Sequence, residues 1–474
     1  MVGPLYSGFM KCDNTLNAMA LQGGSRWQVT LCQLALIVFM VADMLVEQRW
    51  TVWATAAAMA LFIAAEFRLA PLGIRRTAAV LVVITLALLP QLDEPLAALE
   101  RGIRIGGLIS SLLLAIALLS RAALRVARVR EVVGALFKVP ADRRFAALTV
   151  ASQFFGGFLG LAGITMMMEM ASQVPMDSQD EKLACYGAIS RGYAAANLWS
   201  PMYSNVSILL AITPGLLWTT VFPAALLVAL ASLLLGLGLN RWVTRHDAKA
   251  PPGGLSFYAL ARPAWPIIVC MVLFLVIAVG ASRTANVPVA AGIIVLAPIA
   301  AWGLNVALAG LAQGGRQLRA DLGGLRSVVG EVMLFLASGC AGTVIANAMP
   351  TAWTAFIAAG LVSLPILACL FLTASVIVLS CTSVHPMLSG IVVATAFSAS
   401  ALALNPTVHV LAVLVGLGLA VIMTPFSVVS LMASRFSGVP LLTISVRANL
   451  GYAVLCAIFS SLILGGMNGW FQRY

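Results

Sequence analysis

Two clusters of small polar side chains stand beside prolines in otherwise apolar segments of this sequence. The first surrounds Pro201 and consists of Asn197, Ser200, Ser204, Asn205 and Ser207. The second surrounds Pro386 and consists of Ser380, Thr382, Ser383, His385 and Ser389. Hydroxyl, amide and imidazole groups can hydrogen-bond an organic anion, and their oxygens, with free backbone carbonyls, can ligate a sodium ion. Both clusters are therefore candidate binding residues.

A few ionisable residues could add charge or protons to such a site. Arg191 lies in an apolar segment, where a cation is costly unless it faces a cavity or a partner, and its guanidinium can hold a carboxylate through two hydrogen bonds. A structurally paired arginine is the alternative. His385 could carry a coupling proton, or it could be an ordinary hydrogen-bonded histidine. Glu169 is a second proton-carrier candidate, whereas Glu331 and Arg447 are expected near the membrane interfaces.

A short motif connects the two clusters. Residues 199–207 read Trp-Ser-Pro-Met-Tyr-Ser-Asn-Val-Ser, and residues 384–392 read Val-His-Pro-Met-Leu-Ser-Gly-Ile-Val. Proline removes a backbone donor, and irregular backbone inside a bilayer is tolerated only where protein buries it or where it lines a watery cavity. We predict re-entrant hairpins over 183–212 and 378–405, with tips meeting inside the membrane. The alternatives are two kinked helices, or a first segment whose residues 183–199 cross fully.

The remainder of the chain predicts the elements that hold these clusters. Of 474 residues, 61% are hydrophobic and 9% are charged, against about 25% charged in soluble domains. A membrane-spanning helix needs about 20 apolar residues. We predict an all-α polytopic membrane protein with about twelve transmembrane helices plus two re-entrant hairpins in two pseudo-symmetric halves. The expected crossings are 27–46, 48–66, 77–92, 105–119, 145–171, 214–239, 264–281, 288–310, 327–349, 353–376, 407–432 and 440–465.

Basic residues predict the orientation. Lysine and arginine gather in the loops 67–76, 120–144, 240–263 and 311–326, which the positive-inside rule assigns to the cytoplasm. We therefore expect both termini to be cytoplasmic, in the cell inner (plasma) membrane. The net charge of +12 follows from this asymmetry and does not indicate nucleic acid. Residues 121–138 alternate basic and apolar side chains at helical spacing, which predicts an amphipathic helix on the cytoplasmic interface.

The same reading divides the chain into five parts. The expected parts are a cytoplasmic N-terminal segment (1–26), scaffold helices with the amphipathic arm (27–144), a first repeat (145–240), a linker with further scaffold helices (241–326) and a second repeat (327–474).

Around the two clusters, the chain resembles the ion transporter superfamily, which includes dicarboxylate/sodium symporters and the large subunits of TRAP transporters. The resembling segments are 200–207 and 380–386, together with Thr213-Pro214-Gly215 and Thr424-Pro425-Phe426 as helix breaks. The resemblance covers roughly 145–240 and 327–465. Members with the clearest signature carry Ser-Asn-Thr at both tips, whereas this chain has Ser204-Asn205-Val206 and no asparagine at the second tip.

The resemblance implies an elevator-type carrier with scaffold and transport domains, a homodimer in the lipid bilayer, and a small organic anion as solute. It also implies a coupling ion, sodium or a proton, as the sole cofactor, with a possible sodium site at Ser204, Asn205, Thr382 and Thr424.

We therefore expect a secondary active transporter and no enzyme. The alternative is a membrane-embedded enzyme or lipid-linked-sugar handling protein of an envelope pathway, but such proteins usually carry long extracytoplasmic loops, and the longest expected here is 93–104. A channel is disfavoured because no ring-forming motif is visible. No nucleophile elbow, P-loop or His-Glu-x-x-His motif is present, and the eight cysteines and three histidines are scattered. Neither catalytic residues nor a metal centre are expected.

Overall fold

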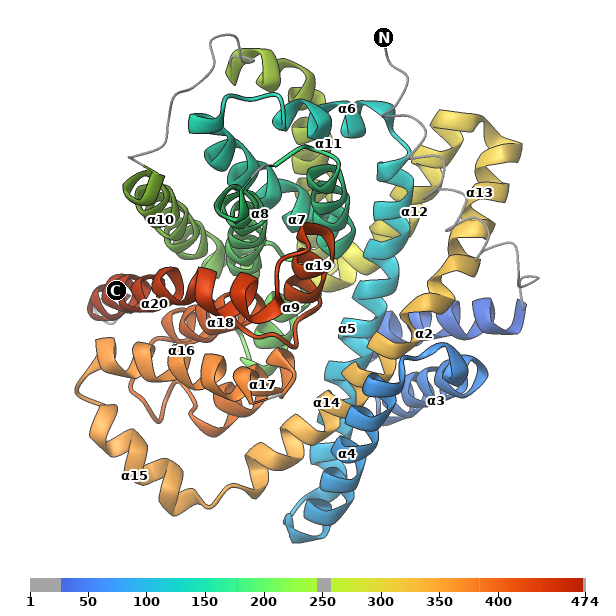
Figure 1. The fold of residues 1–474 in the computed structure, drawn as a ribbon. Coiled ribbons are helices and arrows are strands. Elements are labelled where there is room, and N and C mark those ends of the chain that lie inside the picture. Colours follow the sequence, from blue (N-terminus) through green and yellow to red (C-terminus); the bar gives the residue numbers. More distant parts are fainter. Residues whose placement is uncertain (1–26, 177, 245–256, 383, 472–474) are drawn as a thin grey trace.

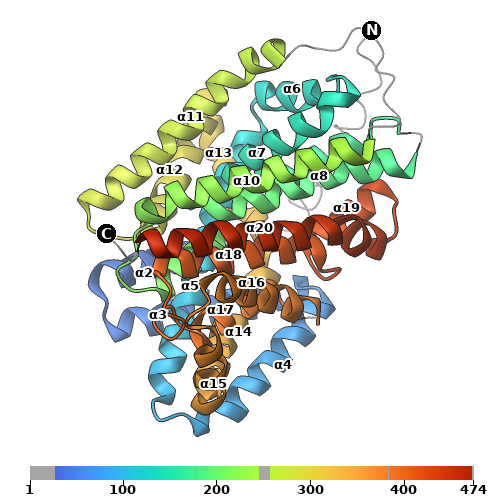
Figure 2. The same cartoon turned by 90° about the vertical axis from the view of Figure 1, so that its left-hand side faces the viewer.

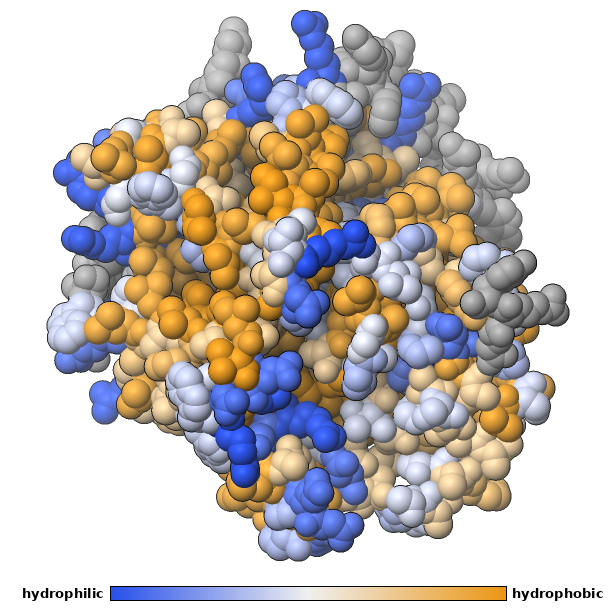
Figure 3. Space-filling view, turned by 180° about the vertical axis from the view of Figure 1, so that it is seen from behind, coloured by the Kyte–Doolittle hydropathy of each residue, from blue (hydrophilic) through white to orange (hydrophobic). Residues whose placement is uncertain are grey.

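The computed structural model describes residues 27–176, 178–244, 257–382 and 384–471. Every regular element in these residues is helical, and eleven helices are long and apolar enough to cross a membrane. The predicted class, an all-α multi-pass membrane protein, is confirmed. Figure 3 shows one face of the molecule, where hydrophobic side chains cover most of the surface and hydrophilic ones gather mainly near the upper edge and at the lower centre.

One bundle is built around the long helix α5 (Figure 1). Small residues bring α5 and α14 close together: Gly102 lies against the backbone of Cys340, and Gly106 against that of Leu336. A side chain at either glycine would push these helices apart. We call this group the α5 bundle. Its helices are α2 (Trp27–Val46), α3 (Arg49–Glu66), α4 (Leu72–Leu88), α5 (Pro95–Leu124), α12 (Val289–Ala309), α13 (Leu311–Gly324) and α14 (Val329–Ala348), with α11 (Phe257–Thr284) packed on α12.

The remaining long helices form a second group, the α8–α18 bundle. Figure 2 shows α8, α10, α18 and α20 lying side by side. Its members are α7 (Ala141–Ser172), α8 (Gln179–Trp199), α9 (Ser204–Ile212), α10 (Trp218–Thr244), α16 (Pro365–Cys381), α17 (Pro386–Ala396), α18 (Pro406–Met423), α19 (Val428–Ser437) and α20 (Ala448–Phe471). Two short helices, α6 (Ala127–Leu136) and α15 (Thr351–Leu361), lie on the connections between the bundles, and a π-helical turn (Thr443–Arg447) precedes α20.

Helix α7 is a helical hairpin that reverses at Gly160, whose backbone has φ 57° and ψ −139°. A Cβ on Gly163 would lie 2.5 Å from the carbonyl oxygen of Phe155, although eight residues of straight helix rise about 12 Å. Arg144, near the start of α7, forms an ion pair of 3.3 Å with Glu181, near the start of α8. The chain therefore runs out along one arm and returns along the other before α8 begins.

Helices α16 and α17 form a second helical hairpin, joined by residues 382–385. The rings of Phe371 and Phe397, near its open end, lie 4.9 Å apart, and Val378 and Val392 line one groove between the arms. In both hairpins the first arm runs parallel to the helix that follows the hairpin. For the first, Arg144 meets Glu181 near the starts, and Gly157 accepts from Ser200 near the ends. For the second, Thr373 donates to the carbonyl of Ala412, and further along Ser380 accepts from Thr424.

Helices α8 and α18 cross in opposite directions. A Cβ on Gly418 would meet the carbonyl of Ala194, while the side chain of Asn197 donates to the carbonyl of Leu414. Residue numbers that increase along α8 therefore pair with residue numbers that decrease along α18, so the two helices are antiparallel. The α7 hairpin with α8 and the α16–α17 hairpin with α18 are therefore two similar units that run in opposite directions.

Several sequence-based expectations about helix boundaries were wrong. The crossing expected over 353–376 is interrupted, since α15 ends at Leu361 and Pro365 opens α16; proline restricts the residue before it and favours the first helical turn. The crossing expected over 145–171 doubles back at Gly160. The amphipathic helix expected over 121–138 is divided, because α5 continues to Leu124 and α6 starts at Ala127.

The first hairpin was expected over 183–212. The break occurs near the predicted point, but α8 before it has 21 residues and α9 after it has nine. This arrangement agrees with the alternative in which 183–199 forms a full-length helix. The Pro-Met-x-Ser repeat also pairs unlike positions: Pro201 lies in the break between α8 and α9, whereas Pro386 is the first residue of the returning arm α17.

The contact between α7 and α8 can be tested with two glycines of the same helix. A Cβ at Gly192 would overlap the carbonyl oxygen of Thr149, whereas a Cβ at Gly187 would point into open space. We expect Gly192→Ala to destabilise the protein by about 1–3 kcal/mol through overpacking. Gly187→Ala should be neutral or stabilise it by up to about 1 kcal/mol through helix propensity. Thermal melting in detergent measures both, and equal melting temperatures for the two variants would contradict the packing.

Candidate functional site

Each of the two breaks in the α8–α18 bundle carries a hydroxyl that binds the end of a hairpin arm. At the first break, the Ser200 hydroxyl donates to the carbonyl of Gly157, in the last turn of the first arm of α7. At the second break, the Thr424 hydroxyl donates to the carbonyl of Ser380 over 2.9 Å, in the last turn of α16. Each hydroxyl immediately precedes a proline. The counterpart of Ser200-Pro201 is therefore Thr424-Pro425.

These carbonyls accept side-chain donors because the helices that contain them end there. The last carbonyls of a helix have no partner in their own helix. Near the turn of α7, the carbonyl of Leu159 accepts from the Ser120 hydroxyl of α5 over 3.0 Å. Hydroxyls from outside the hairpin thus satisfy two of the free carbonyls at its turn, and they fix its position relative to α5 and to the first break.

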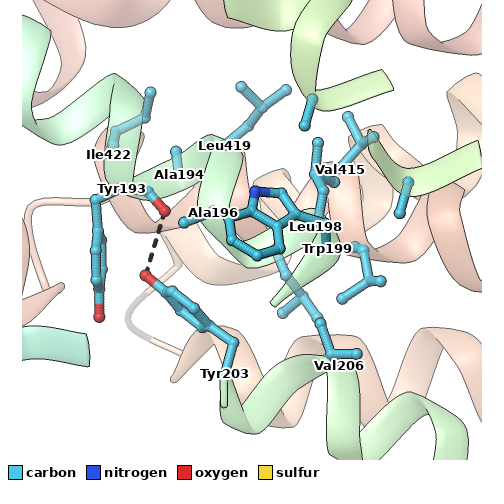
Figure 4. Packing of buried hydrophobic residues seen from close by; sticks show 14 of the residues in the cluster. Tyr193, Ala194, Ala196, Leu198, Trp199, Tyr203, Val206, Val415, Leu419 and Ile422 are labelled. Atoms are coloured by element: carbon cyan, nitrogen blue, oxygen red, sulfur yellow. Dashed lines mark hydrogen bonds between the residues drawn. The ribbon is translucent and has the colours of Figure 1, made fainter. Parts of the chain in front are cut away.

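Aromatic side chains hold the first break in place. The indole nitrogen of Trp218 donates to the carbonyl of Trp199 over 2.9 Å, and the hydroxyl of Tyr203 donates to the carbonyl of Tyr193 over 3.3 Å. Figure 4 shows Trp199 and Tyr203 among buried aliphatic side chains of α8, α9 and α18. Sequence reasoning did not select these aromatic residues, although Trp199 and Tyr203 directly flank the Ser-Pro-Met motif and carried a usable signal.

The amides of the first cluster form a chain of hydrogen bonds. Asn205, in the first turn of α9, donates to the side-chain oxygen of Asn197 over 2.9 Å. Asn197 is fully buried and donates to the carbonyl of Leu414 over 3.1 Å. Ser207 donates to the carbonyl of Pro201 over 3.2 Å, while Ser204 is the first residue of α9 and is half-buried.

The second cluster lies at the turn of the α16–α17 hairpin. The Nδ1 of His385 accepts from the backbone N–H of Met387 over 3.3 Å and caps α17. Thr382 is exposed and donates to the carbonyl of Leu379, and Ser380 donates to that of Val376. Ser389 is buried in the first turn of α17, and Ser383 lies outside the described residues.

Arg191 connects α8 to α20. Its Nε donates to the side-chain oxygen of Asn449 over 3.1 Å, and its Nη2 to the carbonyl of Ala448 over 2.9 Å. Its guanidinium carbon lies 4.7 Å from the centre of the Tyr452 ring. Within the described part of the chain, no carboxylate forms an ion pair with Arg191. Sequence reasoning missed Asn449 and Tyr452, which sit beside the π-helical turn.

Helices α9 and α17, which begin at the two polar clusters, pack against each other. Ile208 of α9 and Met387 of α17 belong to one small buried cluster with Ile105 and Ile109 of α5 and Ile391 of α17. Asn205 lies three residues before Ile208, and His385 lies two residues before Met387. Asn205 and His385 therefore lie within three residues of this cluster along the chain.

The cavity predicted to be shared by Arg191, Asn205, Thr382 and His385 stays a prediction. A cavity of about 370 Å³ lies between the arms of the second hairpin, and none of these four residues lines it. Its lining is almost wholly apolar and consists of Met349, Phe371, Ala374, Ser375, Val378, Leu379, Val392, Val393 and Phe397.

Comparison with known proteins places this arrangement among solved folds. No protein-family model matches the chain, and no curated protein matches its sequence. The crystal structure of the Alcanivorax borkumensis YdaH transporter, described as having an unusual topology, superposes with a TM-score of 0.56. The two chains share the same fold. Their identity is 15%, and the match covers 83% of this chain and 98% of the YdaH chain. At this identity the likeness establishes the fold alone.

Proposed function

We propose that this protein is a secondary active transporter of a small, anionic organic solute, in the manner of the ion transporter superfamily. The observation that carries the proposal is the hairpin followed by a broken helix, which occurs twice and in opposite directions, each time with a hydroxyl bonded to the hairpin arm. Discontinuous helices and repeats of opposite direction are the features on which secondary transporters build their binding sites. The likeness in fold to the YdaH transporter supports the same class.

Two features favour an anionic solute. The N-terminus of α9 has no side-chain cap, so its free N–H groups and helix dipole favour negative charge. Arg191 lies in the middle of α8 without a carboxylate ion-pair partner among the described residues, and a cation at membrane depth is retained where it faces a charge or a cavity. Sodium or a proton would be the coupling ion.

The two bundles suggest how the carrier moves. The α5 bundle would serve as the scaffold and, in a homodimer, as the subunit contact, while the α8–α18 bundle would carry the solute in an elevator-type movement. The chain passes between the bundles near the short helices α6 and α15. Such connections can change direction without breaking the packing inside either bundle.

Helix order gives a topology that differs from the sequence-based one. If both hairpins enter and leave the membrane on one side, the described residues cross it an odd number of times, and Trp27 and Phe471 lie on opposite faces. Gly465, near the end of α20, packs against Ile366, at the start of the second hairpin. The end of α20 would therefore lie on the face of the membrane from which the second hairpin enters. We count as crossings α2, α3, α4, α5, α8 with α9, α10, α11, α12, α14, α18 with α19, and α20.

We therefore expect a cysteine at Gly469 to react with a membrane-impermeant maleimide added to intact cells. A cysteine at Arg128, on the exposed face of α6, should react only after permeabilisation. Both variants are made after replacing the eight natural cysteines. Protection of the Gly469 cysteine in intact cells would favour the two cytoplasmic termini expected from loop charge.

The transport proposal is tested in proteoliposomes loaded and diluted to create a sodium or proton gradient. Uptake of radiolabelled small organic anions should exceed that of empty liposomes and respond to one of the gradients. Ser200→Ala and Thr424→Val should each reduce uptake, because each frees one hairpin arm from its break. Thr354→Val removes an exposed hydroxyl on α15 and should transport normally. The absence of gradient-dependent uptake of any anion would overturn the proposal.

A further inference from the structure

The amide chain at the first break has a fixed direction. A backbone carbonyl only accepts hydrogen bonds, so the side chain of Asn197 must present its Nδ2 to the carbonyl of Leu414. Its Oδ1 therefore faces Asn205 and can only accept. The Nδ2 of Asn205 donates to it over 2.9 Å. Turning either amide around would set oxygen against oxygen or nitrogen against nitrogen.

This direction leaves an acceptor at the end of the chain. Asn197 is fully buried at the crossing of α8 and α18, so neither its Oδ1 nor its Nδ2 can hydrogen-bond water in place of these partners. Asn205 is half-buried in the first turn of α9, and within the described residues its Oδ1 makes no hydrogen bond. A group that binds there must be a hydrogen-bond donor or a cation, because another oxygen lone pair would be repelled.

His385 presents the opposite polarity. Its Nδ1 accepts from the N–H of Met387, and a ring nitrogen that accepts carries no proton. The neutral imidazole then holds its proton on Nε2, which is a donor. Helices α9 and α17 contact each other, so the Asn205 acceptor and the His385 donor stand at the starts of two helices that meet.

The pair Asn197 and Asn205 has no counterpart at the equivalent positions of the second break. Asn197 lies three residues before Ser200, and Asn205 lies five residues after it. The residues three before and five after the equivalent Thr424 are Val421 and Val429. At the second break the amide comes from α20 instead, since Asn449 donates to the carbonyl of Ile422 and its oxygen accepts from Arg191, so the two halves offer a solute different chemistry.

We infer that Asn205 selects a solute that carries a hydrogen-bond donor, a hydroxyl, amine or amide N–H, beside its anionic group. The inference rests on the proposed transport function and narrows its substrate class to hydroxy acids, amino acids and N-acyl amino acids. A plain mono- or dicarboxylate would set a carboxylate oxygen against the Asn205 oxygen or leave that oxygen unpaired. Binding of the correct solute would pair both the Asn205 acceptor and an anionic group.

The experiment compares pairs of acids that differ by one donor group, which in serine is an ammonium that also adds a positive charge. Lactate with propionate, malate with succinate, and serine with 3-hydroxypropionate are tested on the purified full-length protein by isothermal titration and thermal shift. The last pair exchanges the amine, and the first two exchange the hydroxyl. In at least one pair, the acid with the additional donor should bind about threefold to tenfold more tightly, which is the range for one hydrogen bond. Asn205→Ala should remove that preference and leave the weaker acid's Kd unchanged.

A control is Asn347→Ala, which removes an exposed asparagine bound to a backbone carbonyl in α14 and should keep the preference. Equal Kd values within every pair in the unmodified protein would overturn the inference even if Asn205→Ala does not fold, and so would a preference that survives Asn205→Ala. If none of the six acids binds but other organic anions without a donor do, the inference alone fails. If no organic anion binds at all, the transport proposal fails with it.

Discussion

Replacing Arg326 by glutamine is expected to lower the free energy of unfolding by about 3–5 kcal/mol, the range for breaking a buried ion pair by removing one partner. Arg326 follows α13 and donates to both oxygens of Glu66, at the end of α3, over 2.8 and 2.9 Å. The Glu66 side chain is 3% exposed. Its carboxylate would lose both charged donors while remaining almost wholly buried.

Two comparisons isolate the buried charge. Arg49→Gln removes an ion pair with Glu100 in which the arginine side chain is 67% exposed, and it should cost no more than about 1 kcal/mol. The double variant Glu66→Met with Arg326→Leu should recover most of the lost stability, because apolar side chains of similar size often replace a buried pair without loss. Chemical unfolding in mixed micelles measures all three. Equal losses for Arg326→Gln and Arg49→Gln would contradict the buried contact.

Replacing Arg191 by glutamine is expected to weaken binding of an organic anion about tenfold to a hundredfold, since a charge-assisted contact contributes about 1.5–3 kcal/mol. Glutamine can still donate to Asn449 or to the carbonyl of Ala448, the two partners of Arg191 on α20. The fold should therefore persist while the charge is lost. The Kd of the best-binding anion in the transport screen, with the melting temperature of the free protein, separates affinity from stability.

Arg447→Gln provides the control, because Arg447 is exposed at the end of the π-helical turn and its removal should change neither quantity. If Arg191→Gln lowers the melting temperature and leaves the Kd unchanged, Arg191 serves only to hold α8 against α20. In that case the anionic group of the solute is bound elsewhere.

Composition was sufficient to predict the class of this fold, and local backbone geometry was not predictable from it. Low charge and long apolar runs require a helical membrane protein whatever the details. The reversal at Gly160 was missed because a glycine in an apolar run is also typical of close helix packing. A positive φ at one position leaves no trace in the hydropathy. The break between α15 and α16 was missed for a related reason, since the apolar run continues through Pro365.

Proline and clustered polar residues correctly predicted where the helices break. The motif that they form matched the wrong pair of positions in the two halves. The Pro-Met-x-Ser match joined Pro201 with Pro386, whereas the shared chemistry joins Ser200 with Thr424. Serine and threonine donate to a carbonyl equally well, so the correspondence survives a change of residue that a motif search does not tolerate. The partners of Arg191 were unpredictable because Asn449 comes 258 residues later in the chain.

The opposite directions of α8 and α18 have an electrical consequence. Each helix carries a dipole equivalent to about half an elementary charge at either end, and a field across the membrane acts on such charges with about 2.3 kcal/mol per elementary charge per 100 mV. Because the two helices cross in opposite directions, the work that the field does on one backbone dipole largely cancels the work on the other. Displacement of this bundle would then be nearly insensitive to voltage by itself. Any current that accompanies transport would measure the charge of the solute, its coupling ion and Arg191.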